Sequence, residues 1–107
     1  MFAYIQGKLV RKEPTYVVID VGGVGYEIRI SLNTFSDLQM NDTCKLHTYL
    51  HVREDAQLLY GFIQESEKSL FLHLISVSGI GTNTAIVLLS SLSAQEIRQA
   101  IVEENHK

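Results

Sequence analysis

A Gly-Ile-Gly turn lies between two apolar runs in the stretch SVSGIGTNTAIVLL, residues 76 to 89. Gly79 and Gly81 can adopt backbone angles that are closed to other residues, and they leave no side chain between the turn and an approaching ligand. If a helix begins after Gly81, the N–H groups of residues 81 to 84 are unpaired beside its positive dipole end. Such a site binds one phosphate and makes no contact with the base edges, so its affinity does not depend on base sequence. The predicted site consists of Gly79, Ile80, Gly81, Thr82, Asn83 and Thr84. The alternative is that these glycines only end one helix and allow close helix packing.

Two adjacent acids, Glu54 and Asp55, form a second candidate site. Paired carboxylates serve metal-dependent nucleases, so a hydrolase that uses this pair with a histidine is one hypothesis. Neighbours on an extended strand point to opposite faces, however, and the sequence offers no obvious third ligand. His47 and His51 also lack a third ligand nearby. We therefore expect no catalysis, no metal site and no cofactor; a solvated acidic turn remains an alternative.

The segment CKLHTYLHVR, residues 44 to 53, alternates in polarity and predicts a strand. One face carries Cys44, Leu46, Leu50 and Val52. The other face carries Lys45, His47, Tyr49, His51 and Arg53. This basic and aromatic stripe could stack bases and contact phosphates. Periodicity alone favours the solvated side of a strand instead.

Composition limits the function classes. The chain has 107 residues, 46% of them hydrophobic, and can bury one modest core or two small cores that share an interface. The net charge of −3 argues against a broadly basic nucleic-acid coat, so any DNA surface must be local. Cys44 is the single cysteine and is expected to be a small buried side chain. No apolar run approaches the roughly 20 residues of a membrane span, and we expect a cytoplasmic protein.

The residues up to Phe62 are expected to form mainly strands, and the residues after it are expected to form helices. Strands are expected at about 2–12, 15–21, 24–30, 44–53 and 56–63, with a short helix at 32–38. Gly22 and Gly23 suit the positive φ angles of a tight hairpin. This order predicts an α+β protein in which a five-stranded OB-fold barrel, residues 1–63, precedes a small helical domain, residues 64–107.

Helical spacing begins after Phe62. The stretch 65–77 has Glu65 and Glu67 near its start, where the helix dipole favours acids. A second helix is expected after Gly81, capped by Thr82. Its predicted buried side consists of Ala85, Ile86, Leu88 and Leu89. A third helix is expected to start with a capping box of Ser93 and Glu96 and to bury Ile97, Ala100 and Ile101.

Three segments in this order, DVGGVGYE, VREDAQLLYGF and LISVSGIGTNTAIVLLSSLSAQEI, resemble the RuvA family of Holliday junction branch migration subunits. The resemblance covers essentially the whole chain. It implies a non-enzymatic scaffold that binds four-way junction DNA without sequence specificity and holds it open in recombination, DNA repair and the SOS response. The implied partners are a homotetramer, the RuvB ATPase motor and the RuvC resolvase, with no membrane involved. A protein-interaction module is the remaining alternative.

The same resemblance assigns roles to the two candidate sites. The glycine turn corresponds to the first helix-hairpin-helix motif, and Glu54 with Asp55 corresponds to an acidic pin near the four-fold axis of the tetramer. The chain departs from the family pattern because Thr82 and Asn83 follow Gly81, where Pro and Lys are common. It also ends before a second hairpin and before the domain that engages RuvB, so we expect it to be part of a longer protein.

Overall fold

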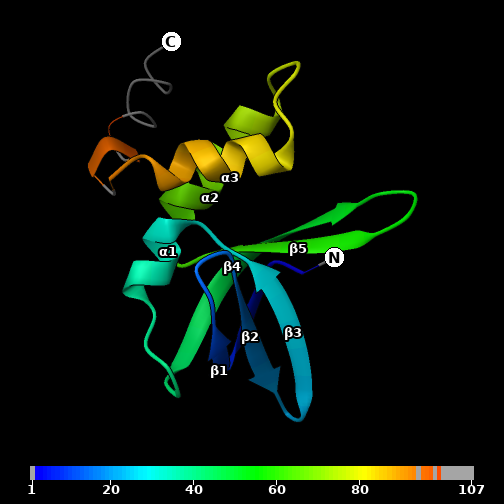
Figure 1. The fold of residues 1–107 in the computed structure, drawn as a ribbon, viewed down its shortest axis with the longest axis vertical. Coiled ribbons are helices and arrows are strands. Elements are labelled where there is room, and N and C mark those ends of the chain that lie inside the picture. Colours follow the sequence, from blue (N-terminus) through cyan, green and yellow to red (C-terminus); the bar gives the residue numbers. More distant parts are fainter. Residues whose placement is uncertain (1, 94, 98, 100–107) are drawn as a thin grey trace.

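The computed structural model describes residues 2–93, 95–97 and 99. Five strands and three helices are defined in it (Figure 1). The strands are β1 (Tyr4–Lys12), β2 (Tyr16–Val21), β3 (Val24–Arg29), β4 (Thr43–Val52) and β5 (Gln57–Phe62). The helices are α1 (Leu32–Asp37), α2 (Glu65–Ile75) and α3 (Thr82–Ser90). Each bound that the sequence predicted lies within three residues of the observed one.

The strands close into a barrel in the order β1-β2-β3-β5-β4. All pairs are antiparallel except β3 and β5, which run parallel where Arg29 pairs with Tyr60. The β2–β3 hairpin turns at Gly22 and Gly23, with φ angles of 61° and 95°. The Asp20 carboxylate accepts a 2.8 Å hydrogen bond from the Gly23 N–H. The predicted α+β class, OB barrel and glycine hairpin are therefore confirmed.

Inward-facing aliphatic side chains fill the barrel. The buried members of this cluster are Ile5, Leu9, Val17, Ile19, Ile28, Ile30, Leu38, Leu46 and Leu59. Gly61 of β5 faces the same interior, where an added Cβ would lie 2.5 Å from Cγ2 of Ile28. That separation is far inside van der Waals contact, so the barrel wall closes tightly only because residue 61 has no side chain.

A second apolar cluster forms where the helices cover the outer face of β4 and β5. Figure 1 shows α2 and α3 together against one side of the barrel, with α1 beside them. The buried members are Tyr60, Phe62, Phe71, Ala85, Leu89 and Ile97. Because alternate residues of a strand face opposite sides, β5 contributes Leu59 to the barrel and Tyr60 to this second cluster. The strand is therefore buried on both faces.

Helix α1 and its N-cap residue contact α2 and α3 through polar groups. The Asn33 side chain donates hydrogen bonds to the carbonyl oxygens of Leu89 (2.8 Å) and Leu92 (2.6 Å). The backbone N–H of Leu32 donates to the Ser90 hydroxyl. Ser31, the N-cap of α1, and Thr34 both donate to the buried carboxylate of Glu67 in α2. Glu67 was expected only as a favourable charge near a helix start, yet it is buried.

Several expected side-chain positions are wrong. Leu88 was placed on the buried side of α3 but is 40% exposed, because Ala85 and Leu89 define the face that packs on α2 and the barrel. Val52 was placed on the apolar face of β4 but is 61% exposed, since β4 extends beyond the barrel there. Cys44 is only partly buried, and both burial and the nearby Asp42 raise the pKa of its thiol.

The capping box at the third predicted helix is confirmed. The Ser93 hydroxyl accepts from the Glu96 N–H (3.1 Å), and the Glu96 carboxylate accepts from the Ser93 N–H (3.0 Å). These bonds lower the pKa of the Glu96 carboxyl. Ile97 is buried as expected, whereas Ala100 and Ile101 lie outside the described residues. Among the described helices, none combines the length and the apolar character that crossing a membrane requires.

Candidate nucleic-acid interface

The α2–α3 turn, residues 76–81, reverses the chain between the two helices. Gly79 has φ +89°, a conformation that L side chains rarely adopt, so this position requires glycine. Gly81 differs from the expectation, because its φ of −88° and ψ of 175° are ordinary extended angles. Apart from its two chain neighbours, no atom of the described residues would lie within 4 Å of a Cβ on Gly81. Neither backbone strain nor internal packing therefore demands glycine at position 81, and its bare backbone faces open space.

The first turn of α3 has unpaired donors. Gly81 is the N-cap residue, and its carbonyl accepts from the Ala85 N–H at 3.0 Å. No side chain in the described part of the protein caps this end of the helix. Within the described residues, the N–H groups of Gly81, Thr82, Asn83 and Thr84 donate no hydrogen bond. Four N–H groups at the positive end of a helix dipole thus remain available to an anion.

Thr82 is the first residue of α3 and not its cap, which corrects the expected capping role. Its hydroxyl oxygen instead accepts a 2.9 Å hydrogen bond from the hydroxyl of Tyr60. The same Tyr60 hydroxyl lies 3.3 Å from Oδ1 of Asn83. Tyr60 was absent from the predicted site. The sequence did contain a signal for it. A tyrosine within an apolar strand is expected to be buried, and a buried tyrosine hydroxyl usually requires a polar partner.

A groove of about 550 Å³ adjoins this helix end. It lies between the end of β3, the start of α1 and one side of α3. Tyr60 and Asn83 line it together with Arg29, the Cα partner of Tyr60 across β3 and β5. The groove therefore brings Arg29 and Asn83 of α3 to one surface, whereas the α2–α3 turn itself carries no positive charge.

The acidic loop, residues 53–56, connects β4 to β5 at the tip of a hairpin that extends beyond the barrel (Figure 1). Arg53 and Ala56 close it by mutual backbone hydrogen bonds of 2.7 and 3.4 Å. Glu54 and Asp55 are both exposed, and Asp55 lies 3.8 Å from the Arg53 guanidinium. The described residues contain no group of three His, Cys, Asp or Glu side chains placed to hold a metal. The acidic loop and the α2–α3 turn are separate features of the surface.

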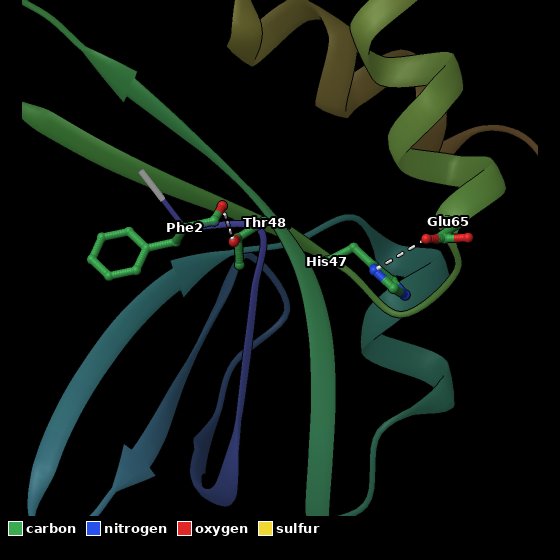
Figure 2. Close-up of polar contacts among 4 residues, drawn as sticks. All are labelled: Phe2, His47, Thr48 and Glu65. Carbon is green, nitrogen blue, oxygen red and sulfur yellow. Dashed lines mark hydrogen bonds and ion pairs between the residues drawn. The ribbon is translucent and has the colours of Figure 1, made fainter.

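The basic and aromatic stripe of β4 is not one solvated surface. Tyr49 packs against Phe71 of α2, with ring centroids 5.6 Å apart. Figure 2 shows His47 reaching toward Glu65 at the start of α2, 3.9 Å from Nδ1 to Oε1. On the opposite face of the strand, the Thr48 hydroxyl donates to the Phe2 carbonyl at 2.9 Å (Figure 2). Both earlier interpretations of the stripe fail at its centre, because the helices cover that part of β4.

Comparisons with known proteins identify a family model and several relatives that are similar to this chain. The model of the RuvA N terminal domain matches residues 1–61. A protein of Cytophaga hutchinsonii named Holliday junction branch migration complex subunit RuvA is 54% identical over all 107 residues, which correspond to 54% of its length. Proteins of the same name from Amoebophilus asiaticus and Bacteroides fragilis are each 50% identical, over 95% and 98% of this chain and 53% and 52% of their own lengths. The chain spans about half the length of these relatives.

Proposed function

The chain belongs to the RuvA N-terminal domain family, and we propose that it is a DNA-binding scaffold that holds four-way junction DNA open for branch migration. Residues 1–63 form the OB-fold domain in this proposal, and residues 64–107 form the helical domain with the first helix-hairpin-helix motif. The scaffold is not an enzyme. A partner ATPase supplies the work.

The observation that carries this proposal is the open end of α3. Four unpaired N–H groups lie beside Gly81, whose missing side chain leaves room for a phosphodiester. Backbone N–H groups contact phosphate oxygens and not base edges, so the contact is independent of base sequence. The phosphate site comprises Gly79, Ile80, Gly81, Thr82, Asn83 and Thr84.

The exposed acidic loop complements that site. Glu54 and Asp55 act as an acidic pin, which repels phosphates of ordinary duplex and steers separated strands at the centre of a junction. Two unit charges about 4 Å apart interact by about 1 kcal/mol in water and by several times that near a protein surface. Four copies of the pair in a tetramer would make this repulsion large enough to influence strand paths. The protruding, exposed position of the loop supports this role.

The proposed partners follow from the family. Four subunits surround the junction, the RuvB motor drives branch migration, and the RuvC resolvase acts on the same junction. These partners place the protein in the bacterial cytoplasm, in recombination, DNA repair and the SOS response.

Binding to matched DNA molecules tests the proposal. A synthetic immobile four-way junction and a linear duplex of the same total length are compared at one salt concentration, since electrostatic affinity depends strongly on salt. We expect tighter binding to the junction, with unchanged affinity when the base sequence of its arms is changed. Equal affinity for the junction and the duplex would overturn the proposed function.

A further inference from the structure

We propose that Tyr60 is a positioning residue of the phosphate site: its buried hydroxyl orients Thr82 and Asn83 so that their hydrogen-bond donors face the ligand. This inference rests on the proposed function. The direct evidence is the pair of contacts from the Tyr60 hydroxyl, 2.9 Å to Oγ1 of Thr82 and 3.3 Å to Oδ1 of Asn83. The Tyr60 hydroxyl lies within donor distance of both acceptors.

The direction of these hydrogen bonds decides what the two side chains offer. A threonine hydroxyl that accepts from Tyr60 keeps its own hydrogen for another partner. An asparagine whose Oδ1 turns toward Tyr60 presents its NH₂ group, a donor only, on the other side. Both side chains then add donors to the N–H groups of residues 81 to 84. When Tyr60 occupies both acceptors, the remaining hydrogens of these two side chains are donors that suit an anion.

Packing and strand pairing hold the Tyr60 side chain in one position. Its side chain is 1% exposed and packs against Phe71, with ring centroids 5.4 Å apart. Its backbone pairs with Tyr49 in β4 and with Arg29 in β3. The hydroxyl therefore holds the side chains of Thr82 and Asn83 at a fixed position relative to β5.

Orientation matters here because the turn has no cation of its own. Residues 76–84 contain neither lysine nor arginine. A point charge attracts phosphate from many directions, whereas neutral hydroxyl and amide donors act only over a narrow range of distance and angle. Neutral donors that are fixed before the ligand arrives also lose less conformational freedom on binding.

The test removes one oxygen atom. Tyr60→Phe keeps the packed ring and deletes the hydroxyl that orients Thr82 and Asn83. We expect affinity for the four-way junction and for the linear duplex to fall roughly three- to tenfold at matched salt, the range typical of one hydrogen bond. In a Thr82→Val, Asn83→Ala background, the Tyr60→Phe substitution should weaken binding no further. If its effect is the same in both backgrounds, Tyr60 does not act through these two side chains.

Tyr49→Phe is the matched control. Tyr49 packs in the same aromatic cluster, but among the described residues its hydroxyl makes no hydrogen bond. We expect wild-type DNA affinity for this variant. Urea unfolding of each variant separates lost stability from lost binding, because a purely structural role would change the unfolding midpoint and leave the affinity of the folded protein unchanged. Wild-type affinity in folded Tyr60→Phe would overturn this inference alone, whereas a wild-type protein that binds no junction would overturn the proposed function.

Discussion

The carboxylate of Glu67 in α2 accepts a 2.9 Å hydrogen bond from the hydroxyl of Thr34 in α1, and its other oxygen accepts from Ser31 at 2.5 Å. Both hydroxyl oxygens also accept, Ser31 from the Thr34 N–H and Thr34 from the Ile63 N–H. This small network is fully hydrogen-bonded and buried, and it joins the barrel to the helix that leads into the α2–α3 turn. It fixes the start of α2 relative to α1 and to the end of β5.

Stability should therefore depend on the protonation of Glu67. Burial, partly offset by the Ser31 and Thr34 hydrogen bonds and reinforced by Asp37, raises the pKa of its carboxyl. The folded state then binds the proton more tightly than the unfolded state. The stabilisation from this group is fully present below the ordinary pKa of a glutamate carboxyl and is lost as pH rises through the higher folded pKa.

Glu67→Gln removes this pH dependence, because an amide also places one donor and one acceptor in the network but cannot ionise. We expect the urea midpoint of the variant to rise relative to wild type as pH increases from about 4 to 7. Glu65→Gln, on an exposed residue of the same helix turn, is the control for loss of one charge. A Glu67→Gln difference that is constant with pH, or that shrinks as pH rises, contradicts this prediction.

Alanine substitutions at the two glycines of the α2–α3 turn should separate stability from DNA binding. Gly79→Ala forces an L side chain to φ +89°, at a cost of about 1–2 kcal/mol in unfolding free energy. Gly81→Ala places a methyl group in open space at ordinary angles, so the change in stability should stay within about 0.5 kcal/mol. Its methyl group nevertheless projects where a phosphate would approach the N–H groups.

Urea titration and junction-binding measurements on both variants check this separation. Gly81→Ala should bind DNA several-fold more weakly while its unfolding midpoint matches wild type. Gly79→Ala should show the clear loss of stability. A Gly81→Ala protein with wild-type DNA affinity would mean that no ligand approaches closely at that position.

Neutralising the two acids of the acidic loop should increase the affinity for linear duplex DNA relative to the affinity for the junction. Glu54→Gln with Asp55→Asn removes two negative charges and changes the net charge from −3 to −1. Because the exposed carboxylates repel phosphates, we expect the linear duplex to bind a few-fold more tightly, with a larger gain at low salt. The junction should gain less, so the ratio of the two affinities falls.

The control for net charge is Glu13→Gln with Glu27→Gln, two exposed or partly exposed acids on other parts of the barrel. It also changes the net charge to −1. An equal gain in duplex affinity for both double variants would assign the effect to total charge. Unchanged or weaker duplex binding by the loop variant would remove the acidic pin from the proposed function.

Local features of the sequence determined most of the elements. Strand-forming composition, with alternating polarity in residues 44–53, predicted five strands, and Gly22 with Gly23 predicted the tight hairpin, because these signals depend on neighbouring residues. The Ser93 and Glu96 capping box was readable for the same reason, since both partners lie three positions apart. The resemblance then supplied roles for the glycine turn and the acid pair that spacing alone could not assign.

The tertiary structure decided which side chains meet across the chain. Periodicity predicts that Tyr49 lies on the face of its strand opposite Leu46 and Leu50, but it cannot show that helices cover that outer face. It likewise cannot bring Glu67 to Thr34, 33 positions away, or Tyr60 to Thr82, 22 positions away. Those contacts arise because the apolar faces of α2 and α3 pack against β4 and β5. This packing places the first residues of each helix beside particular strand and α1 residues. The polar groups then paired where that packing placed them.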